Sequence, residues 1–308
     1  MNSVKTEPLI LEIKGNSLDD GPGVRSVVFF KGCPLSCVWC HNPESKRAVP
    51  EIAFDRTLCT GCGACVDACG EGALKRKRKE FIDRSRCTLC FRCTGVCPSG
   101  ALARVGKKMS VREIVDIVLR DEPFFKTSGG GVTLSGGEPT LYMDFASALL
   151  RALKKKKINT LIETCGFFDY DRFAGLVLPY VNTIYYDIKI IDDADHRRHA
   201  GASNVRILAN FKKLKRDIKK TKIELLPRVP LVPGITDTET NLRGIAAFLA
   251  GEGVRRSSLM RYNPLWHEKA EKLGIRNSAA AMPGMKTWDG RGHYERCREI
   301  FLAAGIDV

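Results

Sequence analysis

Hydrophobic residues along this chain gather in short runs separated by longer amphipathic stretches, mostly after residue 105. The short runs are rich in aliphatic and β-branched residues, as buried strands are. They predict strands over residues 24–30, 132–135, 160–164, 183–188, 223–229 and 257–262. The amphipathic stretches repeat apolar residues at intervals of three and four, which is the spacing of a helix that buries one face. They predict helices over residues 111–120, 141–156, 170–177, 204–219, 239–250 and 294–303.

This alternation predicts an α/β fold with a parallel sheet and right-handed crossover connections. Six strand–helix units are too few to close an eight-stranded barrel, so a partial barrel and an open sheet are both compatible with the pattern. Residues 50–104 interrupt the alternation, because they are rich in cysteine, glycine and charge but poor in apolar residues. We interpret them as an insert held together by bound metal, and residues 1–49 with 105–308 as the main domain.

Composition narrows the class of protein further. The 308 residues are 44% hydrophobic, which suits a folded protein with one large core. No run approaches the about 18 apolar residues of a membrane helix, and the first residues lack the apolar core of a signal peptide. We therefore expect a cytoplasmic protein without membrane contact. Eleven of the thirteen cysteines lie between Cys33 and Cys97, which predicts metal ligands because cytosolic disulfides are rare.

The chain is basic, with 50 Lys and Arg against 35 Asp and Glu and a formal net charge of +15. Basic runs span residues 75–79, 154–157 and 212–220. Solvated helix faces and loops explain such runs most simply, and an acidic protein partner is the next interpretation. Nucleic acid is disfavoured, because no aromatic residues interleave these runs as stacking platforms.

The first cysteine group, Cys33, Cys37 and Cys40, directly follows the strand predicted over residues 24–30. Chemistry in parallel α/β folds lies at the carboxyl ends of strands, so the loop is well placed for a site. Three thiolates can hold a 4Fe–4S cluster whose fourth iron keeps an open coordination position for a small chelating molecule. The alternative is a zinc site that takes His41 as its fourth ligand.

Polar residues also follow several of the later strands. The turn after residues 132–135 consists of Gly136, Gly137, Glu138 and Pro139. Its glycines allow close approach to a ligand and its carboxylate can receive an ammonium group, although a glycine-rich turn before a helix is the plain alternative. The next strand ends carry Glu163, Asp187, Lys189 and Arg228. Each could belong to a structural ion pair, but the carboxyl ends of successive parallel strands lie at one edge of the sheet, where a ligand pocket can form.

The stretches DDGPGVRSVVFFKGCPLSCVWCHNPES and TLSGGEPTLY resemble the radical S-adenosylmethionine (SAM) family of glycyl radical enzyme activases, and the resemblance covers nearly the whole chain. It implies a partial (β/α)6 barrel of the radical SAM type and SAM bound at the Cys33 cluster through its amino and carboxylate groups. Such an oxidoreductase uses one electron to cleave SAM to methionine and a 5′-deoxyadenosyl radical. That radical then takes a hydrogen atom from the C-terminal glycine loop of a partner glycyl radical enzyme.

The resemblance also implies roles for residues around the cofactor. The backbone and carboxylate of the Gly-Gly-Glu-Pro turn would meet the methionyl amine. Glu163 and Asp187 resemble contacts to the ribose, the amine or a cation, and Lys189 and Arg228 resemble contacts to the carboxylate. Trp39 matches the aromatic position beside the adenine, with a packing role as the near-equal alternative. Asn263 stands where one branch of the family has His, so it can hydrogen-bond a ribose or adenine but cannot transfer a proton.

The insert contains two runs that resemble the bacterial ferredoxin pattern C-x2-C-x2-C-x3-C, in which the fourth cysteine binds the other cluster. One 4Fe–4S cluster is then expected on Cys59, Cys62, Cys65 and Cys97. The other is expected on Cys87, Cys90, Cys93 and Cys69. Two zinc knuckles are the alternative. The remaining Cys165 and Cys297 are interpreted as small buried residues.

These features predict a longer-branch activase with three 4Fe–4S clusters, whose ferredoxin-like insert relays electrons from reduced flavodoxin or ferredoxin. Two other functions stay open at this point. The chain could be a radical SAM enzyme that acts directly on a small molecule or nucleic acid, although the Asp20–Gly23 stretch favours an activase. A multi-cluster electron carrier is the non-enzymatic alternative, but a carrier needs neither an open iron position nor the Gly-Gly-Glu-Pro turn.

Overall fold

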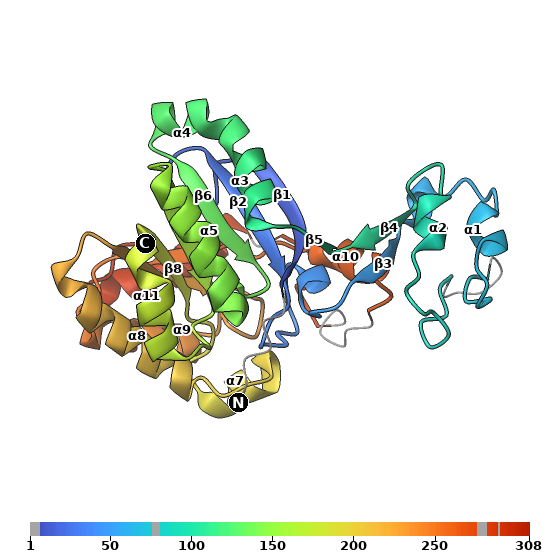
Figure 1. The fold of residues 1–308 in the computed structure, drawn as a ribbon. Helices are drawn as coiled ribbons and strands as arrows, with labels where there is room; N and C mark the ends of the chain where they lie inside the picture. Colours follow the sequence, from blue (N-terminus) through green and yellow to red (C-terminus); the bar gives the residue numbers. More distant parts are fainter. Residues whose placement is uncertain (1–6, 76–80, 276–281, 289) are drawn as a thin grey trace.

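A computed structural model of the protein describes residues 7–75, 81–275, 282–288 and 290–308. Its main body is an eight-stranded sheet in the order β10-β9-β8-β7-β6-β2-β1-β5 (Figure 1). Six neighbouring strands of this sheet are parallel. They are β2 (Arg25–Lys31), β6 (Gly131–Gly136), β7 (Asn159–Thr164), β8 (Thr183–Asp187), β9 (Glu224–Pro230) and β10 (Ser258–Met260). They match the six strands predicted from the sequence, so the α/β fold class is confirmed.

Two strands at one edge of the sheet were not predicted. β1 (Leu9–Ser17) runs antiparallel to β2, and the short β5 (Lys107–Lys108) pairs with β1. Half of β1 faces solvent and carries charges such as Glu12 and Lys14, so its apolar pattern is weak. An edge strand needs less apolar surface than a central strand, which explains why the hydrophobic pattern did not reveal it.

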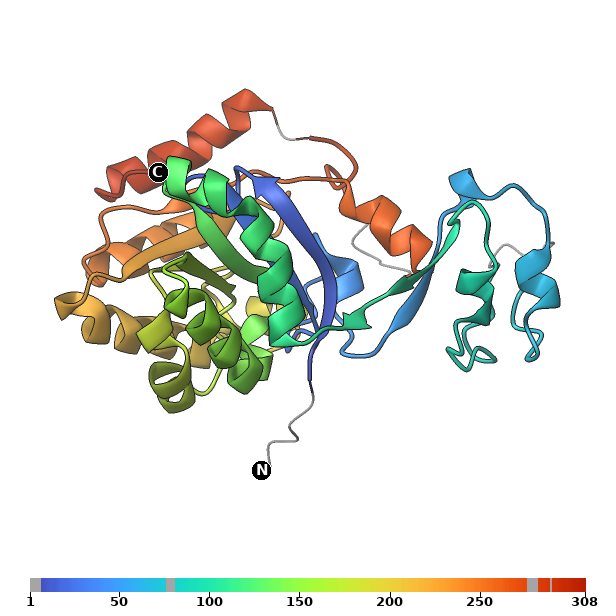
Figure 2. The ribbon, with the colours of Figure 1, turned by 45° about the horizontal axis from the view of Figure 1, so that its top comes forward.

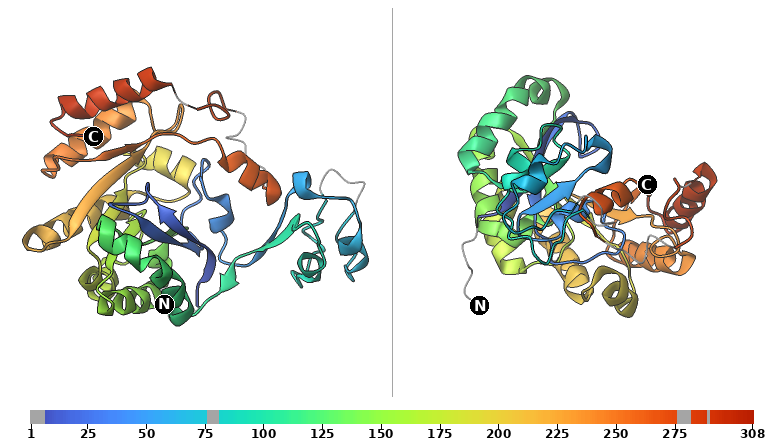
Figure 3. Two further views of the ribbon diagram at one scale, coloured as in Figure 1. Left: turned by 90° about the horizontal axis from the view of Figure 1, so that it is seen from above. Right: turned by 90° about the vertical axis from the view of Figure 1, so that its right-hand side faces the viewer.

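Helices cover the outer face of the sheet (Figure 3). The six predicted ones are α3 (Val111–Val118), α5 (Met143–Lys155), α6 (Tyr170–Leu176), α8 (Val205–Asp217), α9 (Glu239–Gly251) and α11 (Arg291–Ala303). Between this layer and the sheet lies the main core, in which Leu134, Leu149 and Phe211 are fully buried. Three other helices, α4 (Glu122–Ser128), α7 (Asp193–Ala200) and α10 (Trp266–Lys272), are short and were not predicted.

The insert projects away from the main sheet (Figure 2). It begins with β3 (Glu51–Phe54), which pairs antiparallel with the returning β4 (Leu102–Val105). Beyond this pair lie the one-turn helices α1 (Ala64–Asp67) and α2 (Arg92–Gly95). The insert has only a small core, formed around Ile52, Leu74, Ile82 and Leu102. Because so small a core contributes little stability, bound metal would stabilise the insert. The division of the chain at residues 50 and 104 stays a prediction.

Charged residues attach the insert to the main body. Lys31, at the end of β2, is fully buried and forms an ion pair of 2.6 Å with Glu51, the first residue of β3. From α10, Lys272 forms an ion pair of 2.7 Å with Asp55, and Lys269 donates to Asn42 in the cysteine loop at 2.9 Å. The start of the insert is therefore held from two sides, by β2 and by α10.

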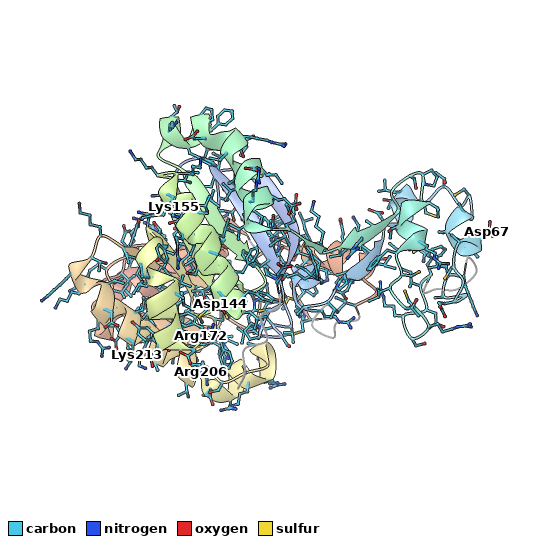
Figure 4. The ribbon with its side chains drawn as sticks, viewed as in Figure 1. Asp67, Asp144, Lys155, Arg172, Arg206 and Lys213 are labelled. Carbon is cyan, nitrogen blue, oxygen red and sulfur yellow. The ribbon has the colours of Figure 1, made fainter. Side chains whose placement is uncertain are left out.

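The basic residues of the runs predicted as solvated faces are mostly exposed where the structure describes them, and Lys75 and Lys215 are half-buried. Lys154 to Lys157 are all exposed at the end of α5. Figure 4 shows Lys155 and Lys213 on the outer helices. Of the run at residues 75–79, only Lys75 lies within the described residues. Within the described ranges, no helix has the length and apolar character needed to cross a membrane.

Candidate active site

The loop of Cys33, Cys37 and Cys40 is held by backbone contacts on two sides. Cys33 donates its amide to Lys46 at 3.1 Å, and the amides of Ser36 and Val38 bond to the carbonyl end of α7 at 2.8 and 2.9 Å. All three cysteines are buried or half-buried. Burial raises the pKa of the Cys37 thiol to about 12, so binding of iron must supply the free energy to remove its proton.

The Gly-Gly-Glu-Pro turn packs directly against this cysteine loop. Gly137 donates to Phe30 and Glu138 donates to Gly32, both at 2.8 Å. A Cβ atom on Gly136 would lie 2.4 Å from the amide nitrogen of Phe30, and one on Gly137 would lie 2.2 Å from the Gly32 oxygen. Both glycines are therefore required for close backbone packing against the end of β2 and the residue that follows it, a reason that adds to the ligand approach inferred from the sequence.

The Glu138 carboxylate is 1% exposed and bonded to several groups of the protein. It accepts hydrogen bonds from the amide and hydroxyl of Thr140, from the Thr164 hydroxyl at 2.9 Å and from the Cys165 amide at 2.7 Å. Three of these bonds fall on Oε1 and one on Oε2, so Oε2 keeps one acceptor position. This arrangement positions the ends of β6 and β7. The predicted contact of Glu138 with an ammonium group stays a prediction, and the neighbouring Pro139 is buried at the start of a 3₁₀ turn.

Four charged side chains from the ends of β7, β8 and β9 form one continuous network. Arg228 lies between two carboxylates, at 2.6 Å from Glu163 and 2.9 Å from Asp187. Lys189 contacts the other oxygen of Asp187 at 2.9 Å. Ser135, on β6, donates to Glu163 at 2.5 Å. The structure thus brings together the four charged residues that the sequence placed at successive strand ends.

This network keeps Asp187 and Lys189 charged although burial opposes their charges. Burial opposes the charge on Lys189, but Asp187 and the buried thiols of Cys37 and Cys165 raise its pKa above the usual range for lysine. Burial likewise opposes ionisation of Asp187, yet Arg228 and Lys189 outweigh it and lower its pKa. The site therefore presents fixed positive and negative charges beside the cysteine loop, which suits a zwitterionic ligand.

Two predicted cofactor contacts have structural neighbours of their own. Trp39 is buried in an apolar cluster with Leu35 and Trp266. Asn263 accepts a hydrogen bond from the Leu265 amide at 2.9 Å, and its backbone bonds to His41 beside the cysteine loop. Both residues therefore lie next to the candidate site, and their contact with adenine or ribose stays a prediction.

Cys165 is a residue whose place at the site was missed. It is buried, as expected, but its thiol lies beside that of Cys33. Its position just after β7 was the available signal, because the other site residues also follow parallel strands. Cys297 is 2% exposed and lies on α11, near His293, so it fits the interpretation of a small buried residue.

The insert contains two pockets that each gather four cysteines. One is lined by Cys59, Cys62, Cys65 and Cys97. The other is lined by Cys69, Cys87, Cys90 and Cys93. Each pocket takes three cysteines from one run and the fourth from the other run, which is the exchange found in two-cluster ferredoxins. The residues fit two 4Fe–4S clusters in the predicted grouping. Among the described residues, no three His, Cys, Asp or Glu side chains are arranged to hold a single metal ion.

Comparison with known protein families agrees with both parts of this structure. Residues 84–241 match the radical SAM superfamily. Residues 58–101 match the 4Fe-4S dicluster domain. A radical SAM methyltransferase from Sphaerobacter thermophilus has a similar fold, with a TM-score of 0.55 at 13% identity over 98% of this chain and 76% of the other.

Relatives of known function identify the branch of the radical SAM superfamily to which the chain belongs. The isethionate sulfite-lyase activating enzyme of Nitratidesulfovibrio vulgaris is 41% identical over 86% of this chain and 87% of its own length. The choline trimethylamine-lyase activating enzyme of Oleidesulfovibrio alaskensis is 37% identical over 93% of each chain. The trans-4-hydroxy-L-proline dehydratase activating enzyme of Clostridioides difficile is 39% identical over 86% of this chain and 88% of its own length. The chain belongs to the radical SAM superfamily and, within it, to the activating enzymes of glycyl radical enzymes.

Proposed function

We propose that this chain reductively cleaves SAM and installs a radical on a glycine of a partner glycyl radical enzyme. The observation that carries the proposal is the cysteine loop beside the paired charges of Glu163, Arg228, Asp187 and Lys189. Family membership supplies the reaction class, an oxidoreductase that uses SAM and an iron–sulfur cluster. The relatives activate lyases and a dehydratase, and we infer a partner from the same range of enzymes.

The residues of the site divide the work of binding between them. Cys33, Cys37 and Cys40 would hold a 4Fe–4S cluster with one open iron position, which supplies the electron for cleavage of SAM. Lys189 and Arg228 would bind the carboxylate of SAM, and Asp187 and Glu163 would bind its ammonium or ribose groups. Because these charges are already paired with one another, they are held in place before the ligand arrives.

We further propose that the insert carries two more 4Fe–4S clusters, so that the chain holds three, and that it receives electrons from reduced flavodoxin or ferredoxin. The two four-cysteine pockets support this number. The relay would be the main functional difference between residues 50–104 and the rest of the chain.

The proposed activity is tested by anaerobic reconstitution followed by reaction with SAM, a strong chemical reductant and a glycyl radical enzyme from the same organism. We expect 5′-deoxyadenosine and a glycyl doublet in electron paramagnetic resonance (EPR) spectra of the partner. Cleavage of SAM without any doublet would contradict an activase and favour an enzyme that acts on a small molecule. Absence of cleavage would contradict the radical SAM assignment of the site.

Replacing Asp187 by alanine is expected to weaken SAM binding by about 1.5–3 kcal/mol, because Arg228 and Lys189 lose the carboxylate that orients them. This corresponds to about a 10- to 150-fold higher Kd in a calorimetric titration. Asp144→Ala is the matched control, since Asp144 forms an exposed ion pair with Arg172 on the outer helices (Figure 4). Equal affinity of both variants and the parent protein would remove Asp187 from the SAM site.

A further inference from the structure

The two cysteine pockets of the insert lie at different depths along the paired strands β3 and β4. The pocket of Cys69, Cys87, Cys90 and Cys93 is lined by Ile52, which directly follows Glu51 at the main-body end of β3. We call it the inner site. The pocket of Cys59, Cys62, Cys65 and Cys97 is lined by Phe54 and Leu102, which form the outer end of the strand pair. We call it the outer site.

The short helices of the insert give the same order. Cys93 of the inner site lies on α2, and Cys65 of the outer site lies on α1. In Figure 1, α2 lies on the side of the main sheet and α1 lies at the far tip, and the view from above in Figure 3 agrees. The outer site is therefore farther from the Cys33 loop than the inner site.

A short bonded path joins the inner site to the Cys33 loop. Ile52 adjoins Glu51, whose carboxylate contacts the buried Lys31 ammonium at 2.6 Å. Only Gly32 separates Lys31 from Cys33 along the chain. Lys31 also donates to the Glu44 carbonyl at 2.6 Å, within the segment that follows Cys40. From the outer site, Asp55, which adjoins Phe54, pairs with Lys272 of α10 at 2.7 Å. Lys269 on the same helix donates to Asn42, just after Cys40, so this second route runs through an additional helix.

The outer site is the more open one. Two of its cysteines, Cys59 and Cys62, are exposed, whereas the inner site exposes only Cys90. Beside the outer cysteines, Leu58 is 51% exposed and Val96 is 43% exposed. Leu58 adjoins the exposed Cys59, and Val96 adjoins the half-buried Cys97 of the same pocket. Exposed apolar side chains beside candidate cluster ligands suit a brief, small contact, and weak redox encounters bury little surface.

From this geometry we propose that electrons enter at the outer site, from a small one-electron donor protein that docks on Leu58 and Val96. The donor would lose one electron, which would travel through the groups held at the outer site, then at the inner site, and then by Cys33, Cys37 and Cys40. No bond is made or broken in these steps, and no proton is required. The inference rests on the proposed three clusters, but it adds their order and the docking face.

The order of electron transfer is tested by comparing two variants. Cys62→Ala removes a ligand from the outer site, and Cys90→Ala removes a ligand from the inner site. Each variant should retain about eight of about twelve irons. Reduced flavodoxin is mixed with each protein without SAM or partner enzyme, and cluster reduction is followed by freeze-quench EPR. We expect the outer cluster of Cys90→Ala to be reduced at the parent rate. Reduction of the inner cluster of Cys62→Ala should be at least tenfold slower.

The opposite pattern, with fast reduction in Cys62→Ala and slow reduction in Cys90→Ala, would overturn the order.

A second test leaves all cysteines in place. Leu58→Glu and Val96→Glu should slow reduction by flavodoxin without loss of iron. Val49→Glu is the matched control, because Val49 is also 43% exposed but lies at the main-body end of β3, and it should have no effect. Slowing by Val49→Glu alone would place the docking face elsewhere.

These outcomes are independent of the proposed activity. Cluster reduction is read directly by EPR, so the order of clusters can fail while SAM cleavage with a chemical reductant is intact. Conversely, loss of SAM cleavage in a protein whose clusters are reduced in the proposed order would contradict only the activity.

Discussion

Replacement of Cys33, Cys37 and Cys40 together by alanine is expected to abolish SAM cleavage and to remove about four of about twelve irons per chain. The loop carries the three ligands of the cluster with the open iron position. The eight insert cysteines line two separate pockets and should keep their clusters. Iron and sulfide analysis after anaerobic reconstitution measures the first effect, and chromatographic detection of 5′-deoxyadenosine measures the second.

Cys297→Ala is the control for the triple variant. Cys297 is 2% exposed on α11, outside the loop and the insert pockets, so its loss should leave the iron content and cleavage unchanged. Retained cleavage in the triple variant would locate the reactive cluster elsewhere in the chain. If the parent protein contained zinc in place of most of the expected iron, all three cluster assignments would be contradicted.

The second large effect is expected on stability, from Lys31→Met. The change keeps the apolar stem of Lys31 but leaves the Glu51 carboxylate, 5% exposed, without its buried partner. Breaking such a pair destabilises a protein by about 3–5 kcal/mol. The midpoint of thermal unfolding should fall, and detachment of the insert should accompany it, which limited proteolysis near Glu51 would detect.

Arg47→Met provides a matched control on the same carboxylate. Arg47 contacts Glu51 at 3.3 Å but is 64% exposed, so its loss should lower stability by about 1 kcal/mol or less. The double variant Lys31→Met with Glu51→Leu should recover most of the stability, because no unpaired charge is then buried. Equal effects of Lys31→Met and Arg47→Met would show that the buried pair does not anchor the insert.

Local sequence patterns were sufficient to predict the parallel strands and outer helices of the main body and to group the insert cysteines. The six parallel strands and the outer helices bury continuous apolar stripes, so their periodicity is visible in the sequence. The weakly patterned elements were missed. α7 is mostly polar and begins at the Asp192 cap. α10 is a two-turn helix whose last turn contacts Asn42 and Asp55. Such elements depend on tertiary contacts more than on their own sequence.

The sequence by itself determined the class of chemistry, because cluster ligands and strand ends are local features whose spacing can be read directly. Only the tertiary structure decided how distant residues pair. It placed Arg228 between Glu163 and Asp187, occupied the Glu138 carboxylate with four protein donors, and put Cys165 beside Cys33. It also ordered the two insert sites, since depth along β3 and β4 depends on the path of the folded chain and on the buried bond between Lys31 and Glu51.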